Sequence, residues 1–299
     1  MSEFSEISEP LHLTRSLASH RFSMIPKNTE VFDKMEIRVL DNNKEQGVLS
    51  FILKDSNPVF ANTLRRLMVD EVPTMAIEDV EFAKNNSILY DEMIAHRLGL
   101  IPLKTDLKSY NLPDKCKCEG KGCNRCQLKM VLRATKGSGV VYASEIKSKD
   151  PAVKPVHGNI PIVKLLKGQT LELEATAVLG KGKQHMKWSP CHVYYKYRPS
   201  IEITGEVKNP EAIIEVDHNN VFEIKDRKLV INKDRVLNCD LSLDFSEIDK
   251  NVKVTASDTD FVFYLESFGQ LSCKEIVSKA IDIFDEQLDE FVEELKKAK

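Results

Sequence analysis

Four cysteines that fall within eleven residues form the part of this 299-residue sequence with the clearest chemistry. They are Cys116, Cys118, Cys123 and Cys126, in the pattern C-x-C, four intervening residues, then C-x-x-C. Four thiolates at such spacings are the ligand set of a structural zinc site. The other three cysteines are scattered along the chain, and an odd total with one tight cluster does not match a secreted disulfide framework. The pattern therefore predicts a metal site in a reducing compartment.

The loop from Pro113 to Gln127 needs such a site to become ordered. It has no aliphatic or aromatic side chain except the proline ring, so burial of apolar area cannot offset the conformational entropy that ordering costs. A bound metal can offset this entropy cost. Gly120 and Gly122 allow the backbone to reverse between the two cysteine pairs. Lysine and arginine side chains in the loop offset the charge of a tetrathiolate site, and we expect them to lower the pKa values of the thiols.

Structural Zn²⁺ is the favoured occupant of this loop, because four protein ligands leave no open coordination position and need no redox partner. The cysteine run of bacterial ferredoxins is missing, which argues against an iron–sulfur cluster. The cluster stays an alternative, as does a loop without metal whose thiols are reduced or paired in disulfides.

The elements that must position this loop follow from hydrophobic periodicity and from Gly and Pro positions. Residues 1–30 lack sustained periodicity and are expected to form a mobile arm. A helix is expected to begin at Pro58 and to end before Pro73, and a second to cover Asp91–Leu100. Strands are expected at Lys34–Leu40, Gly47–Leu53, Met75–Phe82, Lys129–Arg133, Gly139–Ile146, Thr170–Val178, Val193–Tyr197, Val221–Ile224, Lys228–Ile231 and Phe261–Glu266.

The C-terminal helix has the strongest sequence signals. Ser272 and Glu275 stand in capping-box register, which predicts a start near Cys273. Apolar residues then recur at intervals of four and three, the spacing of a seam that faces a helical partner: Val277, Ile281, Phe284, Leu288, Phe291 and Leu295. A second apolar line broadens this stripe in the first half alone. We infer that the first half lies on the protein's own sheet and that the second meets something else, although the whole helix packing on its own core is equally compatible with the periodicity.

Enzyme and membrane functions have little support in the sequence. It has no phosphate-binding loop, nucleophile elbow, zinc-protease motif or dinucleotide fingerprint. A formal charge of −3 gives no global attraction to nucleic acid, and no run is long and apolar enough for a membrane span. The glycines of L-G-K-G-K at Leu179–Lys183 are too few to indicate more than a loop. The lysines in and just after this segment form a basic patch. We interpret this patch and the cysteine loop as solvated loops or protein contacts rather than as DNA contacts.

Several stretches carry a family resemblance. They are A-N-T-L-R-R-L-M-V-D-E-V-P-T-M-A-I-E-D-V-E-F at Ala61–Phe82, D-E-M-I-A-H-R-L-G-L-I-P-L at Asp91–Leu103, L-G-K-G-K-Q-H-M-K-W-S-P at Leu179–Pro190 and E-S-F-G-Q-L at Glu266–Leu271. Together they resemble the alpha-like subunits of multisubunit DNA-directed RNA polymerases, most closely the archaeal group called D and its eukaryotic counterparts. The resemblance extends from about residue 31 to the end of the sequence.

The resemblance implies an α+β fold with a discontinuous dimerisation domain, residues 31–74 plus 195–299, and a mostly antiparallel β domain, residues 75–194, inserted into it. A small insertion, 207–249, interrupts the second segment. Some archaeal members carry ferredoxin-like cysteines in that insertion, whereas here it holds only Cys239. The cysteine loop is instead similar to the zinc loop of the eukaryotic polymerase II counterpart.

The resemblance also implies partners. Members of the family pair with a small alpha-like subunit, called L in archaea, and the pair is the platform on which the two large catalytic subunits assemble, with little or no direct DNA contact and no membrane. The implied partner interface comprises Phe60, Leu64, Arg65, Arg66 and Leu67 together with the seam of the C-terminal helix.

The predicted function is thus a non-catalytic assembly subunit with one structural Zn²⁺. It is expected in the cytoplasm, or in the nucleus if the source is eukaryotic. The alternative is a free-standing zinc-dependent nucleic-acid-binding module, suggested by the two basic patches.

Overall fold

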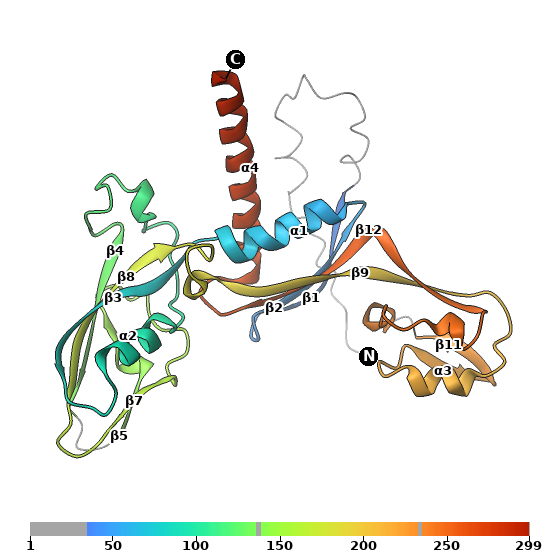
Figure 1. The fold of residues 1–299 in the computed structure, drawn as a ribbon, viewed down its shortest axis with the longest axis horizontal. Helices are drawn as coiled ribbons and strands as arrows, with labels where there is room; N and C mark the ends of the chain where they lie inside the picture. The colour runs from blue at the N-terminus through green and yellow to red at the C-terminus, as the bar shows by residue number, and fades with distance from the viewer. Residues whose placement is uncertain (1–34, 136–138, 233–234, 299) are drawn as a thin grey trace, which may run out of the picture.

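The computed structural model describes residues 35–135, 139–232 and 235–298. The predicted arm at residues 1–30 lies outside this range. The main sheet has four antiparallel strands in the order β1 (Glu36–Asn43), β2 (Val48–Lys54), β12 (Val252–Ser267) and β9 (Cys191–Ile203). Strands from the two ends of the described chain therefore lie side by side in one sheet, as Figure 1 shows.

The pairing of β2 with β12 builds the core of this part of the molecule. Phe51 stands opposite Phe263, and their rings stack with centroids 4.9 Å apart. Leu49 and Leu53 point to the same face of β2, because side chains alternate along a strand, and both are buried. This apolar face is the one that the helices cover.

Helix α1 (Pro58–Arg66) begins as the sequence predicts, with Pro58 in its first turn and the Asn57 side chain accepting the Phe60 N–H at 2.8 Å. It continues without a break into a π-helical turn over Leu67–Glu71, in which the Val72 N–H bonds to the Leu67 carbonyl. The sequence did not predict this turn. Its wider hydrogen-bond ring shifts the backbone carbonyls at the end of α1, a feature common at functional sites.

Helix α4 (Cys273–Lys297) has the predicted capping box, since Ser272 and Glu275 bond reciprocally through their side chains and backbone N–H groups. Ile276, Ala280 and Ile283 are buried against the main sheet. Beyond them the helix leaves the body of the protein and projects from it, as Figure 1 shows. The two halves of α4 therefore have different surroundings in the described chain.

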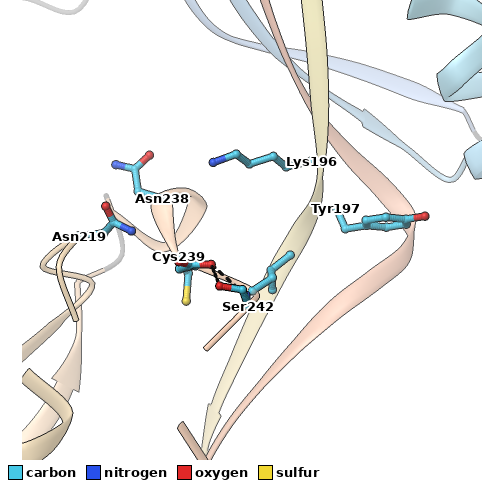
Figure 2. A pocket seen from close by; sticks show the side chains of 8 residues that line it. Lys196, Tyr197, Asn219, Asn238, Cys239 and Ser242 are labelled. Carbon is cyan, nitrogen blue, oxygen red and sulfur yellow. Dashed lines mark hydrogen bonds between the residues drawn. The ribbon is translucent and has the colours of Figure 1, made fainter. Parts of the chain in front are cut away.

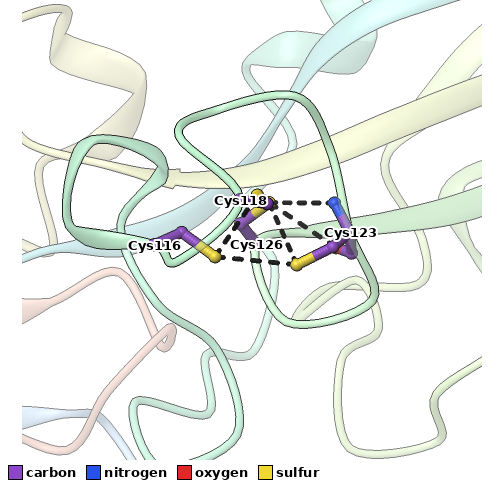
Figure 3. A group of neighbouring side chains, drawn as sticks. All are labelled: Cys116, Cys118, Cys123 and Cys126. Atoms are coloured by element: carbon purple, nitrogen blue, oxygen red, sulfur yellow. Dashed lines mark hydrogen bonds between the residues drawn. The ribbon is translucent and has the colours of Figure 1, made fainter.

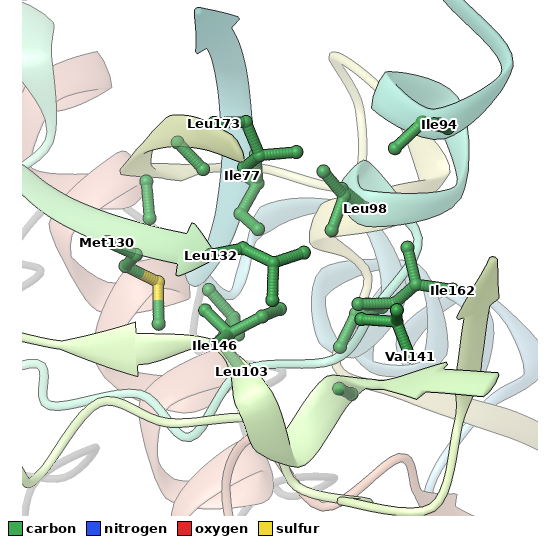
Figure 4. Close-up of a cluster of buried hydrophobic side chains, with 14 of the residues drawn as sticks. Ile77, Ile94, Leu98, Leu103, Met130, Leu132, Val141, Ile146, Ile162 and Leu173 are labelled. Atoms are coloured by element: carbon green, nitrogen blue, oxygen red, sulfur yellow. The ribbon is translucent and has the colours of Figure 1, made fainter. Parts of the chain in front are cut away.

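A second sheet carries the cysteine loop. Its strand order is β3 (Thr74–Asn85), β8 (Leu171–Gly180), β4 (Gln127–Ala134) and β6 (Lys147–Ser148), and a two-stranded ribbon of β5 (Gly139–Tyr142) and β7 (Pro161–Leu165) lies beside it. Helix α2 (Asp91–Gly99) packs on this region through Ile94 and Leu98, which Figure 4 shows within one apolar cluster with Ile77 and Leu132.

A third, smaller core lies in the segment between β9 and β12. It contains α3 (Pro210–Val216) and the hairpin of β10 (Phe222–Lys225) and β11 (Lys228–Ile231), with Phe222 and Phe245 5.2 Å apart between ring centroids. The only cysteine here, Cys239, is buried, and burial, with a smaller contribution from nearby carboxylates, raises the pKa of its thiol to about 11.

The predicted α+β class with mostly antiparallel sheets is confirmed. Several element bounds differ from prediction: β9 and β12 are much longer than the strands expected there, and the strand expected at Gly139–Ile146 ends at Tyr142. Strand β7 and helix α3 were not predicted. No described helix is both long and apolar enough to cross a membrane.

The two glycines of L-G-K-G-K, at the end of β8 and in the turn that follows it, also pack closely against neighbouring residues. A Cβ on Gly180 would lie 2.4 Å from ring atoms of Trp188, whose indole N–H donates to the Val178 carbonyl at 3.2 Å. A Cβ on Gly182 would lie 2.1 Å from the Val69 carbonyl oxygen. Both positions therefore exclude any side chain, because packed interiors cannot absorb such overlaps.

We expect Gly180→Ala to lower the free energy of unfolding by about 1–3 kcal/mol, since the methyl group must displace the Trp188 ring. Gly99→Ala is the control, because a Cβ there meets its nearest atom, the Ile77 carbonyl oxygen, at an ordinary 3.4 Å. Chemical denaturation of both variants measures the difference. Equal stability of Gly180→Ala and the unmodified protein would contradict the proposed packing.

Candidate metal centre and partner surface

The four cysteines of the loop converge on one point, as Figure 3 shows. Their sulfur atoms all lie within 4.8 Å of one another. The sulfur of Cys116 lies 3.6 Å from that of Cys123 and 3.4 Å from that of Cys118, and the sulfur of Cys126 lies 3.4 Å from that of Cys118 and 3.8 Å from that of Cys123. Within the described residues, no other group of three or more His, Cys, Asp or Glu side chains is placed to share a metal ion.

Backbone turns place the sulfurs. The N–H of Glu119 bonds to the Cys116 carbonyl, and the N–H of Cys126 bonds to the Cys123 carbonyl, each at 3.0 Å. The Cys123 N–H also points at the Cys126 sulfur at 3.1 Å. Gly120 and Gly122 have positive φ values of 77° and 88°, so they provide the reversal that the sequence predicts.

The loop joins the second sheet at its C-terminal end, and a backbone hydrogen bond holds the residue before the loop against that end. Cys126 leads directly into β4, and the Asn111 N–H bonds to the Arg125 carbonyl at 2.7 Å. Next to this bond, the buried Tyr110 donates its hydroxyl to the Asp150 carboxylate at 2.8 Å. Burial and this hydrogen bond raise the pKa of Tyr110 to about 12, so the phenol stays a donor at neutral pH.

The thiols differ in their pKa values. Hydrogen bonding to the Cys116 sulfur, and then to that of Cys126, lowers the pKa of Cys118 to about 6, whereas burial raises the pKa of Cys126 to about 12. The basic side chains expected to lower these values are not the cause. Lys115 and Lys121 instead face carboxylates, Glu286 at 3.9 Å and Glu119 at 3.7 Å.

The sulfur cage fits a tetrahedral metal site. A tetrahedron with metal–sulfur bonds of about 2.3 Å has sulfur–sulfur edges of roughly 3.8 Å, close to the separations in the loop. The chain can therefore hold one metal ion with four protein ligands, and such a closed site leaves no position for a reacting water.

The predicted interface residues in α1 and in the first position of its π-helical turn fall into two groups. Leu64 and Leu67 are buried in the protein's own core, so they offer almost no surface to a partner. Phe60 is half-buried and meets Phe284 of α4 edge-on, with ring centroids 6.1 Å apart. The apolar residues of this segment indicated one apolar face, but part of that face is buried inside the protein itself.

Arg65 and Arg66 lie at the end of α1. The Arg65 guanidinium donates to the Asn62 side-chain oxygen from two nitrogens, at 3.1 and 3.0 Å. Arg66 is exposed and lies 3.8 Å from the Asp70 carboxylate. Because solvent screens such a pair strongly, the charge of Arg66 remains available to another molecule.

The apolar seam of α4 is half-buried in its first part and exposed in its second part. Val277, Ile281 and Phe284 are half-buried against the main core. The last three members are exposed, with Leu288 at 40%, Phe291 at 62% and Leu295 at 51% of their full accessible surface. Three large apolar side chains on one face of a projecting helix form an unusual surface for a free protein, and such patches mark interaction sites.

A shallow cavity of about 350 Å³ lies between β9 and the small third core, as Figure 2 shows. Lys196, Asn219 and Asn238 line it. Its cysteine, Cys239, stands without a second sulfur or histidine among the lining residues, so this cavity lacks the donor set of a metal or iron–sulfur site.

Comparison with known proteins decides the family. Residues 76–190 match the family model described as the RNA polymerase Rpb3/RpoA insert domain. The chain is 40% identical over 266 residues to DNA-directed RNA polymerase subunit Rpo3 of Methanosphaera stadtmanae, covering 86% of this chain and 97% of the relative. It is 36% identical over 264 residues to the Rpo3 subunit of Pyrococcus furiosus, covering 88% and 98%, and 37% identical over 266 residues to that of Archaeoglobus fulgidus, covering 87% and 99%.

The chain belongs to the Rpo3 family of DNA-directed RNA polymerase subunits. The sequence prediction of a non-catalytic assembly subunit of RNA polymerase is thereby confirmed, and so is the resemblance to the alpha-like subunits. Its partners are other polymerase subunits. The matched insert domain spans the whole cysteine loop.

The basic patch beside Trp188 gives little support to a nucleic-acid-binding module. Lys181 pairs with Glu71 at 2.7 Å, and Lys187 pairs closely with Glu78 while its ammonium lies 4.4 Å from the centroid of the Trp188 ring. The sequence did not predict these partners, because Glu71 is 110 residues away from Lys181.

We expect Cys126→Ser to lose the roughly one equivalent of bound metal per chain that a closed four-sulfur site holds, and to lower thermal stability, because a hydroxyl replaces a thiolate ligand. Cys239→Ser is the control, since its thiol is buried far along the chain from the cluster. Elemental analysis of the purified proteins gives the metal content. Full metal content in Cys126→Ser would show that other residues are the ligands.

Proposed function

We propose that this chain forms a heterodimer with the small alpha-like subunit that archaea call L, and that the pair is the platform on which the two large catalytic subunits of the polymerase assemble. The exposed seam of α4 carries this proposal, since Leu288, Phe291 and Leu295 keep 40–62% of their accessible surface in the described chain. A second amphipathic helix from the partner would bury them at the intervals of four and three. Each such side chain contributes about 1.5–3 kcal/mol when fully buried.

The partner surface in this proposal comprises Phe60 and the α4 seam from Val277 to Leu295, with Arg65 and Arg66 at its edge. Leu64 and Leu67 support it from within by holding α1 on the sheet. The contact of Phe60 with Phe284 supports a continuous surface across α1 and α4.

The proposed domains are a discontinuous dimerisation domain, residues 31–74 plus 195–299 with the small insertion 207–249, and an inserted domain, residues 75–194. The shared sheet of β1, β2, β9 and β12 supports this division. Because β9 starts at Cys191 and Val193 packs in the main core, the better boundary is at Cys191.

The proposed metal is Zn²⁺, with a structural role and with Cys116, Cys118, Cys123 and Cys126 as ligands. The tight sulfur spacing favours a single ion, since thiolates around an iron–sulfur cluster stand at the corners of a larger unit and lie farther apart. In this role the ion fixes the loop that leads into β4, and no reaction step takes place at it.

In this proposal the protein makes little or no direct contact with DNA, because the lysines near Trp188 are paired with carboxylates. It places the protein in the cytoplasm, in keeping with its archaeal relatives.

We expect the double variant Leu288→Asp/Phe291→Asp to weaken binding to the small alpha-like subunit by about 3 kcal/mol or more, roughly a hundredfold in Kd, since the interface would bury unpaired charges. Isothermal titration of the two purified subunits measures the effect. Glu293→Ala, in the same exposed turn and on the opposite face of α4, is the control. Unchanged affinity in the double variant would reject this seam as the interface.

A further inference from the structure

The chain that leads from α2 into the cysteine loop follows α4 on its way. The Thr105 N–H donates to the Gln270 carbonyl at 3.0 Å, just before α4 begins. Ten residues later, the Lys115 ammonium reaches the Glu286 carboxylate, well along the helix. We call residues 105–115 the bracing segment. It connects the start of α4, the projecting half of α4 and the cysteine loop.

Two residues in the middle of the bracing segment also join the two parts of the molecule. Leu107 packs against the main core and against the core of the inserted domain. Lys108 lies close enough to Glu275, in the first turn of α4, to lower the pKa of that carboxylate, although the hydrogen bonds with Ser272 lower it more. The segment therefore keeps contact with α4 after the helix has begun.

The cysteine loop fixes the far end of the bracing segment. Lys115 directly precedes Cys116, and its N–H donates to the Leu112 carbonyl at 3.1 Å in a short 3-10 turn. The Asn111 N–H donates to the Arg125 carbonyl at the other end of the loop. The loop has almost no apolar side chains to hold this arrangement, so its order depends on ligands that share one ion.

Glu286 meets Lys115 on the side of α4 that faces away from the seam. Its carboxylate lies 3.9 Å from the Lys115 ammonium and 3.6 Å from that of Lys279, two turns earlier on the same helix. Glu286 follows Phe284 by two residues, and residues at this spacing point to opposite sides of a helix. A partner that packs on the seam therefore leaves this ion pair in place.

The position of this ion pair matters more than its strength, because an exposed pair contributes little to the stability of a folded protein. Ile283 is the last buried residue of α4 in the described chain, so Lys115 meets the helix about one turn beyond its last contact with the main core. The remainder of α4 is marginal by itself, since isolated helices below about 12–15 residues rarely persist in water. The bracing segment thus supports α4 where the core no longer does.

We propose that the metal-bound cysteine loop, acting through the ion pair of Lys115 with Glu286, holds α4 in the orientation that the small alpha-like subunit binds, so that metal binding and partner binding strengthen each other. The proposal rests on the proposed function. A partner that meets a helix already held in place loses less conformational entropy on binding. Coupling between two binding sites is reciprocal, so the bound partner raises the affinity of the loop for the metal by the same factor.

The first test measures, by isothermal titration, the affinity of the purified chain for the small alpha-like subunit before and after a chelator has removed the metal. We expect the complex to be about fivefold weaker or more without metal. In the Lys115→Glu variant we expect removal of the metal to change the affinity much less, because the link to α4 is already broken. Lys121→Glu is the matched control, since this lysine of the same loop faces Glu119 at 3.7 Å.

A second comparison needs no removal of metal. With metal bound, we expect Lys115→Glu to bind the small subunit about two- to fivefold more weakly than Lys121→Glu, and we expect the charge exchange Lys115→Glu/Glu286→Lys to restore the affinity. Equal affinity of the unmodified chain with and without metal would overturn the proposal. The same metal dependence in Lys115→Glu as in Lys121→Glu, or no rescue by the charge exchange, would also overturn it.

Hydrogen exchange of the free chain separates this proposal from the proposed function. If the unmodified chain fails to bind the small subunit, the proposed function fails, and exchange then decides whether the loop supports α4. We expect the amides of residues 283–285 to exchange roughly twofold faster or more after removal of the metal, and also in metal-bound Lys115→Glu but not in Lys121→Glu. Unchanged exchange at these amides would overturn the proposal.

Discussion

The pairing of β2 with β12 is the interaction on which the rest of the molecule depends. It joins residues near the start of the described chain to residues near its end and brings Phe51 onto Phe263. The buried face of this sheet then holds α1 and the first half of α4. Strands so distant in sequence pair only after a large loss of loop entropy, which the shared apolar core must offset.

The inserted domain has its own sheet and core, and the cysteine loop depends on it. The loop contributes almost no apolar surface, and its four sulfur atoms are instead placed so that they could hold one metal ion. The segment after β8 contacts the end of α1 through the close approach of Gly182, the backbone hydrogen bond of Lys183 and the ion pair with Glu71. Residues of the inserted domain and of the loop after β8 thus hold the end of α1.

Features that depend on neighbouring residues were predictable from the sequence. The capping box of α4, the start of α1 at Pro58 and the convergence of four cysteines follow from short spacings, and each is present in the structure. The π-helical turn was not predictable, because its carbonyls are engaged by residues more than a hundred positions away. Nor could periodicity distinguish Leu64 and Leu67, which face the protein's own core, from Leu288 and Phe291, which face solvent. An apolar stripe indicates a face that favours burial and does not say whether the same chain buries it.

Hydrogen exchange of α4, in the free chain and in its complex with the small alpha-like subunit, tests the central claim most directly. The account predicts that amides in the first half of α4, which lies on the sheet, are protected in both states, whereas those from about Glu286 onward gain protection only in the complex. Equal protection of the second half in the free chain and in the complex would contradict it.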